Sequence, residues 1–314
     1  MGRKPSKSKS FSLFGLLKMF VFAGLVFGVI YGISYGVSEF SRLDLATLLD
    51  KSLVPIPEVA GKYIERGSSL LNRDKEDEVP VNSREILKIA LLSDSHNDND
   101  NLASAITKST DIGAQAIVFL GDYTSVGSLD ELKKAKEAMD TSTLPYYSVP
   151  GDHDLWKSEG SLNFTSVFGQ RYGSLAINGV KLILIDNSDN EIGVDKDQLK
   201  WFSEELESVD GNVQTFVFMS NPLYNSDGFK LMGENNEAVS DQAALLLSLI
   251  RSSSVKAVLA GDNHRSDKVL DPERDTLTHI VVGALTKERN LQTPRFDILT
   301  VYENGEHRVS EIIL

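Results

Sequence analysis

Four apolar, β-prone runs in this sequence each end in a cluster of aspartate and histidine side chains. They finish in LLSDSH (91–96), VFLGDY (118–123), VPGDHD (149–154) and VLAGDNH (258–264). In three of them a glycine precedes the aspartate, which lets the backbone turn sharply and approach a ligand closely. Since ligands in open α/β sheets bind at the carboxyl ends of the strands, this recurrence predicts a sheet protein with a polar site at one rim.

From residue 84 onward, strand and helix patterns alternate along the chain. Strands are expected at 85–92, 114–120, 145–149, 213–219, 255–260 and 278–283, helices at 100–113, 128–140, 195–208 and 240–253, and hairpins at 174–186 and 296–314. Ser128 with Glu131, and Asp195 with Gln198, have the spacing of a helix cap and capping box. Alternation of this kind predicts βαβ units, and the hairpins add antiparallel strands. The expected fold is an α/β sandwich of two mixed β-sheets flanked by helices.

The N-terminal segment has the composition of a membrane helix. Residues 19–37 contain no charged side chain, and a helix of about 20 apolar residues spans a bilayer. Basic residues precede the segment, so the positive-inside rule predicts a cytoplasmic N-terminus and an extracytoplasmic body. A cleaved signal peptide is the alternative, although no A-x-A-like cleavage site follows. The expected organisation is a basic tail (1–18), a transmembrane helix (19–37), a stalk (38–83) and one domain (84–314).

Glycine recurs every fourth residue within this segment, at Gly24, Gly28, Gly32 and Gly36. At that spacing the glycines line one face of a helix and allow a second backbone to approach. The pattern predicts a helix–helix pair. Glycine is also common in membrane helices for other reasons, which is the alternative.

Charge and cysteine content exclude several functions. The net charge is -13, yet residues 1–18 hold five of the 32 basic side chains and none of the 45 acidic ones. A body this acidic repels polyanions, so a nucleic acid partner is not expected. The chain has no cysteine, which excludes disulfides, thiolate metal sites and a cysteine nucleophile.

Five strand ends deliver ligand-type side chains to the expected rim. They carry Asp94 and His96, then Asp122, then Asp152 and His153, then Ser220 and Asn221, and finally Asp262 and His264. Each piece alone is also typical of an ordinary turn with an aspartate cap or of a hydrogen-bonded structural histidine. The combination favours a metal site.

The order of these motifs resembles a known family. Its pattern runs D-x-H, G-D-x-x-D, G-N-H-D/E, a histidine before a proline-containing turn, and G-H-x-H. This chain has DSH (94–96), GDYTS (121–125), GDHD (151–154), SNPLY (220–224) and GDNH (261–264). Across residues 85–314 the sequence is similar to the calcineurin-like metallophosphoesterases, which include purple acid phosphatases and bacterial phosphodiesterases.

The resemblance implies roles for individual residues. Asp94, His96, Asp122 and His264 would hold a first metal, and Asp122 would bridge to a second. The second metal would also use Asp152, Ser220 and Asp262. His153 would lie beside the reacting phosphate and aid charge stabilisation or protonation of the leaving group.

Four positions depart from the family pattern. Asp152 replaces an asparagine, Ser220 and Asp262 replace histidines, and Ser125 replaces an aspartate. The first site keeps two carboxylates and two imidazoles, which suit Mn, Fe or Zn. The second becomes an oxygen-only shell, which suits Mg, Mn or Ca.

The convergence of carboxylates bears on whether an ion binds. Four aspartates within a few ångströms cannot all ionise without a counter-charge. A bound cation is the simplest source. Protonated histidines or raised carboxyl pKa values are the alternatives.

Two functions from different classes remain open. One is a membrane-anchored metal-dependent phosphoesterase that hydrolyses a phosphate mono- or diester by attack of a hydroxide held by the metals. The other is a catalytically impaired protein of the same fold, acting as a binding or sensor module. Tyr123, Tyr224, Asn221 and the segment 225–239 are candidates to contact substrate, although 225–239 also fits an ordinary surface loop.

Overall fold

The computed structural model describes residues 83–208, 213–290 and 292–314. The proposed tail, transmembrane segment and stalk lie outside these residues. No helix within the described residues is both long enough and apolar enough to cross a membrane.

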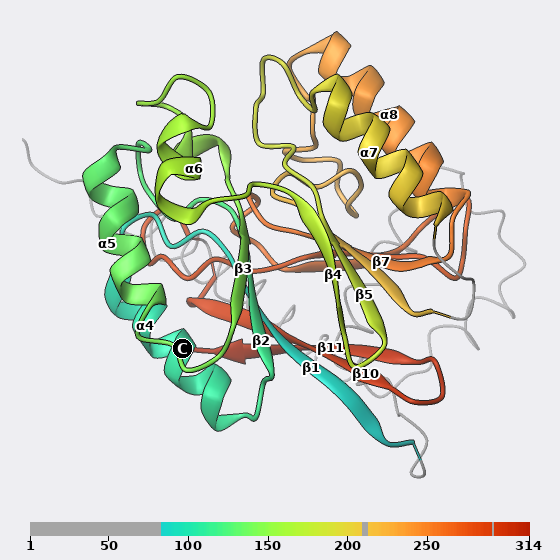
Figure 1. The fold of residues 1–314 in the computed structure, drawn as a ribbon, viewed down its shortest axis with the longest axis horizontal. Helices are drawn as coiled ribbons and strands as arrows, with labels where there is room; N and C mark the ends of the chain where they lie inside the picture. Colours follow the sequence, from blue (N-terminus) through green and yellow to red (C-terminus); the bar gives the residue numbers. More distant parts are fainter. Residues whose placement is uncertain (1–82, 209–212, 291) are drawn as a thin grey trace, which may run out of the picture. The chain divides into compact units, whose positions relative to one another are not determined.

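Eleven strands of the described chain form two mixed sheets (Figure 1). The first sheet has the order β11-β10-β1-β2-β3 and the second has the order β4-β5-β6-β7-β9-β8. The first comprises β1 (Glu85–Leu92), β2 (Ala116–Leu120), β3 (Tyr146–Val149), β10 (Arg295–Tyr302) and β11 (His307–Ile313). The second comprises β4 (Gly173–Ile177), β5 (Val180–Leu184), β6 (Thr215–Phe218), β7 (Val255–Ala260), β8 (Asp267–Leu270) and β9 (Thr278–Val281). The expected α/β sandwich of two mixed sheets is therefore confirmed.

Each sheet contains a run of parallel strands beside antiparallel ones. Strands β1, β2 and β3 pair in parallel, and so do β5, β6, β7 and β9. Parallel strands present their carboxyl ends at one edge, so the turns after β1, β2, β3, β6 and β7 are brought toward a common rim.

Side chains alternate along β1 between two apolar layers. Leu87, Ile89 and Leu91 pack between the two sheets, whereas Ala90 and Leu92 pack beneath helices. Such alternation follows from the two-residue repeat of a strand. Because both faces are covered, β1 reads in the sequence as a nearly continuous apolar run.

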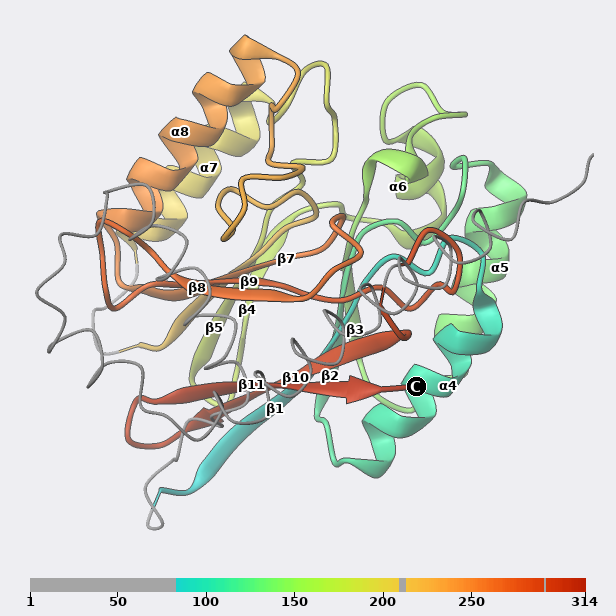
Figure 2. The ribbon, with the colours of Figure 1, turned by 180° about the vertical axis from the view of Figure 1, so that it is seen from behind.

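Helices cover the two outer faces of the sandwich (Figures 1 and 2). Helices α4 (Asn99–Asp111), α5 (Leu129–Met139) and α6 (Leu162–Phe168) cover the first sheet, and α7 (Lys196–Glu207) and α8 (Glu237–Arg251) cover the second. The capping box of Ser128 and Glu131 is present. Asp195 caps α7 as expected. Gln198, however, does not complete a box, because its side-chain amide binds the backbone N and O of Asp186 instead.

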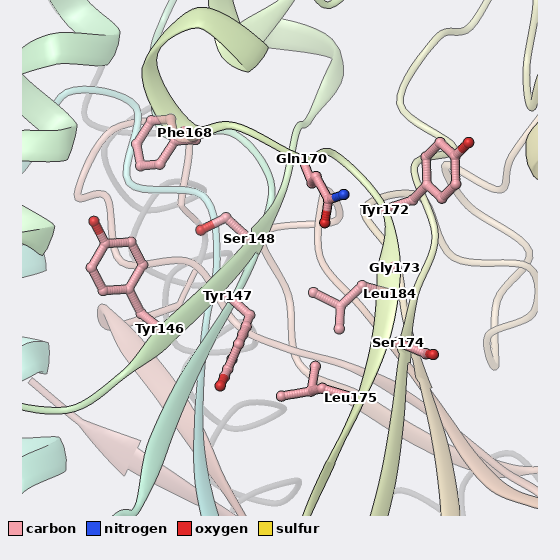
Figure 3. A pocket seen from close by; sticks show the side chains of 10 residues that line it. All are labelled: Tyr146, Tyr147, Ser148, Phe168, Gln170, Tyr172, Gly173, Ser174, Leu175 and Leu184. Carbon is pink, nitrogen blue, oxygen red and sulfur yellow. The ribbon is translucent and has the colours of Figure 1, made fainter.

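A cavity of about 340 Å³ lies between strands β3 and β4 (Figure 3). Its lining includes Tyr146, Tyr147, Phe168 and Tyr172. None of the metal-ligand candidates lines it. The cavity is therefore separate from the polar rim.

Candidate metal centre

Backbone hydrogen bonds tie the strand-end turns to one another. Asp94 N donates to the carbonyl oxygen of Gly121, and His96 N donates to that of Asp122, each over 3.0 Å. The two sheets meet where Asp262 N donates to Oδ2 of Asp94 over 3.2 Å. Asp94 and Asp262, which are 168 residues apart in sequence, are thus held at one rim.

The turns carry their functional side chains on strained backbone. Asp94, His96, Asp122, Asp262 and His264 all have positive φ, between 42° and 64°. Non-glycine residues rarely adopt this left-handed conformation because Cβ then crowds the backbone. Strain of this kind gathers at functional sites, where it directs side chains toward a ligand.

Four of the predicted ligands converge into what is here named the first cluster, Asp94, His96, Asp122 and His264. One ligand atom from each lies within 4.8 Å of all the others. Nε2 of His264 is 3.4 Å from Oδ1 of Asp94, and Nε2 of His96 is 3.6 Å from Oδ2 of Asp122. The structure therefore brings together the set expected to hold the first metal.

Both histidines of the first cluster present Nε2 to it. Nδ1 of His96 contacts the carbonyl oxygen of Thr124, and Nδ1 of His264 contacts that of Arg289, each at 3.2 Å. A carbonyl oxygen only accepts, so in the neutral ring each Nδ1 carries the proton and each Nε2 keeps a lone pair. Metal-bound histidines are oriented by the same kind of outer hydrogen bond.

The donor set fits a divalent cation. Oδ1 of Asp94 and Oδ2 of Asp122 are buried and accept no hydrogen bond from the described residues. Buried carboxylate oxygens are normally satisfied, and a metal ion would satisfy these. Two carboxylates with two imidazoles suit Mn, Fe or Zn.

The surroundings shift the pKa values of the two histidines of the first cluster in opposite directions. Burial lowers the pKa of His96 to about 4, against the opposing charge of Asp94. The pKa of His264 is raised, because its contact with Asp94 outweighs the effect of burial. For Asp94 the two nearby histidines overcome burial, so its pKa is lowered.

Other carboxylates lie close to Asp122 and act on its pKa. Burial raises the pKa of Asp122 well above its ordinary value, and the charges of Asp152 and Asp94 raise it further. Burial also raises the pKa of Asp262 to about 7, even though Lys230 opposes the shift. Without a metal ion, these carboxyls retain protons that isolated aspartates would lose.

A second cluster consists of Asp122, Asp152 and His153, whose ligand atoms again lie within 4.8 Å of one another. Oδ2 of Asp152 accepts from Nδ2 of Asn190 over 3.1 Å. Nδ1 of His153 contacts the carbonyl oxygen of Ser125 at 2.8 Å. The predicted catalytic histidine therefore lies beside two of the predicted ligands of the second metal.

Ser220 and Asn221 lie at the same rim, after β6. Both backbone N–H groups donate to Oδ1 of Asn187, which fixes the turn. Oγ of Ser220 is buried, and in the described chain it has no hydrogen-bond partner. Nδ2 of Asn221 donates to Asn190, the residue that also holds Asp152.

Asp262, expected to bind the second metal, has a different partner. Neither cluster found among the described residues includes it. Its Oδ1 is 3.5 Å from Nζ of Lys230, and its backbone carbonyl accepts from the same ammonium over 2.9 Å. Lys230 lies in the segment 225–239, which was a candidate to contact substrate, but its contact with Asp262 joins residues 32 positions apart and no local pattern predicts it.

Asp154 organises the two clusters without belonging to either. Its carboxylate is fully buried and accepts from the backbone N–H groups of Gly151, Asp122, Tyr123 and Thr124. Burial raises its pKa to about 6 in spite of these donors. Asp154 was not among the predicted site residues, although its position at the end of the GDHD run (151–154) was a usable signal.

Trp156, which no sequence motif singled out, contacts the proposed catalytic histidine. Its ring lies over His153, with ring centroids 3.9 Å apart and planes inclined by 32°. The side chain is 57% exposed. An indole at this position offers an apolar face to a substrate group at the edge of the site.

The two tyrosines expected near substrate, Tyr123 and Tyr224, differ in burial. Tyr123 is fully buried, stacks between Phe119 and Phe168, and bonds Ser148 through its hydroxyl. Its proposed contact with substrate is therefore wrong, because its ring belongs to the core. Tyr224 is half-buried beside His279, and its role stays a prediction.

The family model described as "Calcineurin-like phosphoesterase" matches residues 87–266, more than half of the chain. The chain belongs to the calcineurin-like phosphoesterase family. The match spans every predicted ligand position of the phosphoesterase, from Asp94 to His264.

Individual relatives of the phosphoesterase are distant. A protein from Fibrobacter succinogenes, described as "Probable cyclic nucleotide phosphodiesterase", is 23% identical over 195 residues, which cover 58% of this chain and 74% of the relative. A dimetal phosphatase from Danio rerio superposes with a TM-score of 0.60 at 16% identity, covering 73% of this chain and 98% of that one. A purple acid phosphatase from yellow lupin gives a TM-score of 0.59 at 13% identity, covering 75% of this chain and 52% of that one.

The structural likenesses establish the fold of the phosphoesterase. Taken together, the family, the fold and the first cluster are those of a metal-dependent phosphoric ester hydrolase.

Proposed function

We propose that this protein hydrolyses a phosphate mono- or diester in a metal-dependent reaction. One observation carries the proposal: two imidazole Nε2 atoms and two carboxylates converge within 4.8 Å, and two of the carboxylate oxygens are buried without hydrogen bonds. Asp94, His96, Asp122 and His264 would hold a divalent ion. When bound, such an ion supplies Lewis-acid activation of water and neutralises phosphoryl oxygens.

His153 is the proposed proton carrier. Its Nδ1 is held by the carbonyl oxygen of Ser125, which leaves Nε2 as the nitrogen that exchanges protons. The ring lies beside Asp122 and Asp152, where the phosphate is expected. In this position Nε2 donates a proton to the leaving oxygen.

Two further groups position the reacting parts. Asn190 bridges Asp152 and Asn221, which come from different sheets. Asp154 fixes four backbone N–H groups of the turns that carry Asp122 and His153. Rigid support of this kind keeps ligands and substrate at reacting distance.

The test is hydrolysis of an aryl phosphate monoester and of the matching diester by the full chain purified in detergent. Mn, Mg, Ca and Zn are titrated in turn. Turnover that depends on metal and disappears in Asp122→Asn, but not in the exposed control Asp111→Asn, supports the proposal. A cyclic nucleotide is the next substrate to test, because the Fibrobacter succinogenes relative is described as a phosphodiesterase of that class.

The catalytically impaired binding module is the other outcome of this test. A folded protein that binds metal and a phosphate ester, yet turns over none of these substrates with any ion, would show that the protein is a binding module and not an enzyme. Ser220 in place of a histidine ligand is the observation in its favour, since a neutral hydroxyl is a weak metal ligand.

We further propose that residues 19–37 anchor the protein in the cell membrane, with the N-terminus cytoplasmic and the domain extracytoplasmic. The absence of charge over this segment and the basic tail before it support the proposal. Protease added to intact cells should digest the C-terminal domain and spare a tag at the N-terminus. Release of the full chain by alkaline carbonate would contradict the anchor.

Gly24, Gly28, Gly32 and Gly36 are proposed to form a helix–helix contact within the membrane. Gly28→Ile should weaken cross-linking between two copies of the full chain, whereas Val29→Ile should not. Equal cross-linking of both variants would exclude the glycine face as the contact.

A further inference from the structure

Lys230 places its ammonium group against the carboxylates of the metal centre. Nζ donates to the carbonyl oxygen of Asp262 over 2.9 Å and lies 3.5 Å from Oδ1 of the same residue. The charge of Asp262 acts most strongly on this ammonium, followed by those of Asp94, Asp122 and Asp152. Lys230 thus contacts Asp262 directly, and the charges of the other three carboxylates also raise its pKa.

The backbone around Lys230 is held in place. The carbonyl oxygen of Phe229 accepts from the side-chain amides of Asn225 and Asn263, over 2.7 and 3.2 Å. Two residues further on, Met232 N donates to the carbonyl oxygen of Pro222 over 2.9 Å. Lys230 itself has a φ of 51°, which a lysine adopts only when its surroundings enforce it.

The residues left for a second divalent ion do not fit one well. Asp262 pairs with Lys230 and belongs to neither ligand cluster among the described residues. Ser220 offers only a neutral hydroxyl. Asp122, Asp152 and His153 remain, but Asp122 is shared with the first cluster and Nδ1 of His153 is held by the carbonyl oxygen of Ser125.

We propose that the ammonium of Lys230 takes the place of a second metal ion, so that this phosphoesterase holds one divalent cation, at the first cluster. This inference rests on the proposed metal-dependent function and specifies how many metal ions the site holds. It parts from the Danio rerio neighbour, which is described as a dimetal phosphatase.

Charge balance favours this assignment. A divalent ion at the first cluster offsets Asp94 and Asp122, and the ammonium offsets Asp262. Asp152 then remains, with Nδ2 of Asn190 as the donor to its Oδ2, while its Oδ1 is buried and has no hydrogen-bond partner among the described residues. A second divalent ion beside Asp152 would face the positive charge of Lys230 across the site and would be repelled.

The experiment counts bound Mn²⁺ on the full chain after equilibrium dialysis and records its electron paramagnetic resonance spectrum. The wild type should hold about one Mn²⁺ per chain, with the spectrum of an isolated ion. Lys230→Met should gain a second Mn²⁺, because the repelling charge is gone and Asp262 is released. Spin coupling between the two ions should then change the spectrum.

Three further variants control the result. Lys230→Arg keeps the charge and should keep one ion, and Lys133→Met, on the exposed face of α5, should leave the count unchanged. Lys230→Gln is a second neutral variant and is used if Lys230→Met unfolds. Two ions in the wild type, or one ion in both neutral variants, would overturn the proposal.

The metal count and the turnover measurement test the two proposals separately. A wild type with one ion and no hydrolysis leaves Lys230 as the second cation while the catalytic proposal fails. A wild type with two ions and rapid hydrolysis keeps the enzyme and rejects the role of Lys230.

Discussion

Nε2 of His96 and Nε2 of His264 lie 2.8 Å apart. Each Nδ1 donates to a backbone carbonyl oxygen, so two lone pairs face one another unless a cation separates them. In the absence of metal that cation is a proton, held on His264, whose pKa is raised while that of His96 is lowered to about 4. A divalent ion at the same place takes both lone pairs.

Replacing His96 by asparagine should therefore weaken Mn²⁺ binding. Loss of an outer partner of a metal ligand costs about 10–100-fold in affinity, and loss of a ligand itself should cost at least as much. Isothermal titration of the full chain measures the change. His307→Asn, on the edge strand β11, is the matched control, and an equal loss of affinity in both variants would contradict the assignment.

Metal should stabilise the fold more as pH rises. In the metal-free protein the pKa of Asp122 is raised well above its ordinary value and that of Asp262 is raised to about 7. At these two carboxyls the folded state binds more protons than the unfolded state above about pH 4, so their contribution to metal-free stability falls as pH rises toward and through 7, whereas the lowered pKa of His96 acts in the opposite sense between about pH 4 and 6.5. Mn²⁺ supplies the missing positive charge. The increase in Tm on adding Mn²⁺ should be larger at about pH 8 than at about pH 5.5, and an equal increase would refute the charge argument.

Asp154→Ala should destabilise the protein and abolish metal binding together. The substitution leaves four buried backbone N–H groups and the hydroxyl of Thr124 without their acceptor. Each buried unsatisfied group costs about 1–3 kcal/mol, so a loss of about 3 kcal/mol or more in the free energy of unfolding is expected. Urea denaturation measures it. Thr124→Val removes only the hydroxyl contacts and should cost less.

Trp156 should act on substrate binding. Its exposed ring lies over His153, and aromatic contacts contribute about 0.5–1.5 kcal/mol. Trp156→Ala should thus raise KM for an aryl phosphate by about 2–10-fold, while Trp156→Phe should retain the lower KM. A small alkyl phosphate should show no such change. Equal losses on both substrates would mean that the ring supports His153 and does not contact substrate.

Local signals in the sequence were sufficient for most of the fold. The capping box at Ser128 and Glu131 and the Asn178-Gly179 turn involve only neighbouring residues, and both mark real boundaries. Besides the three-residue 3-10 helix η1 (Asp152–Asp154), two elements of the described chain were not predicted. Helix α6 has only seven residues, and strand β8 is a four-residue edge strand with charged side chains. Both are too short for a hydrophobic repeat to show.

The sequence by itself determined which side chains gather at the rim, because parallel strands must present their carboxyl ends at one edge. Only the tertiary structure decided what each side chain does there. Tyr123 follows a strand as Asp122 does, yet its ring is buried in the core. Lys230, in the loop 225–239 that was a candidate to contact substrate, instead pairs with Asp262. Such contacts depend on packing between segments distant in sequence, and no local pattern of residues encodes that packing.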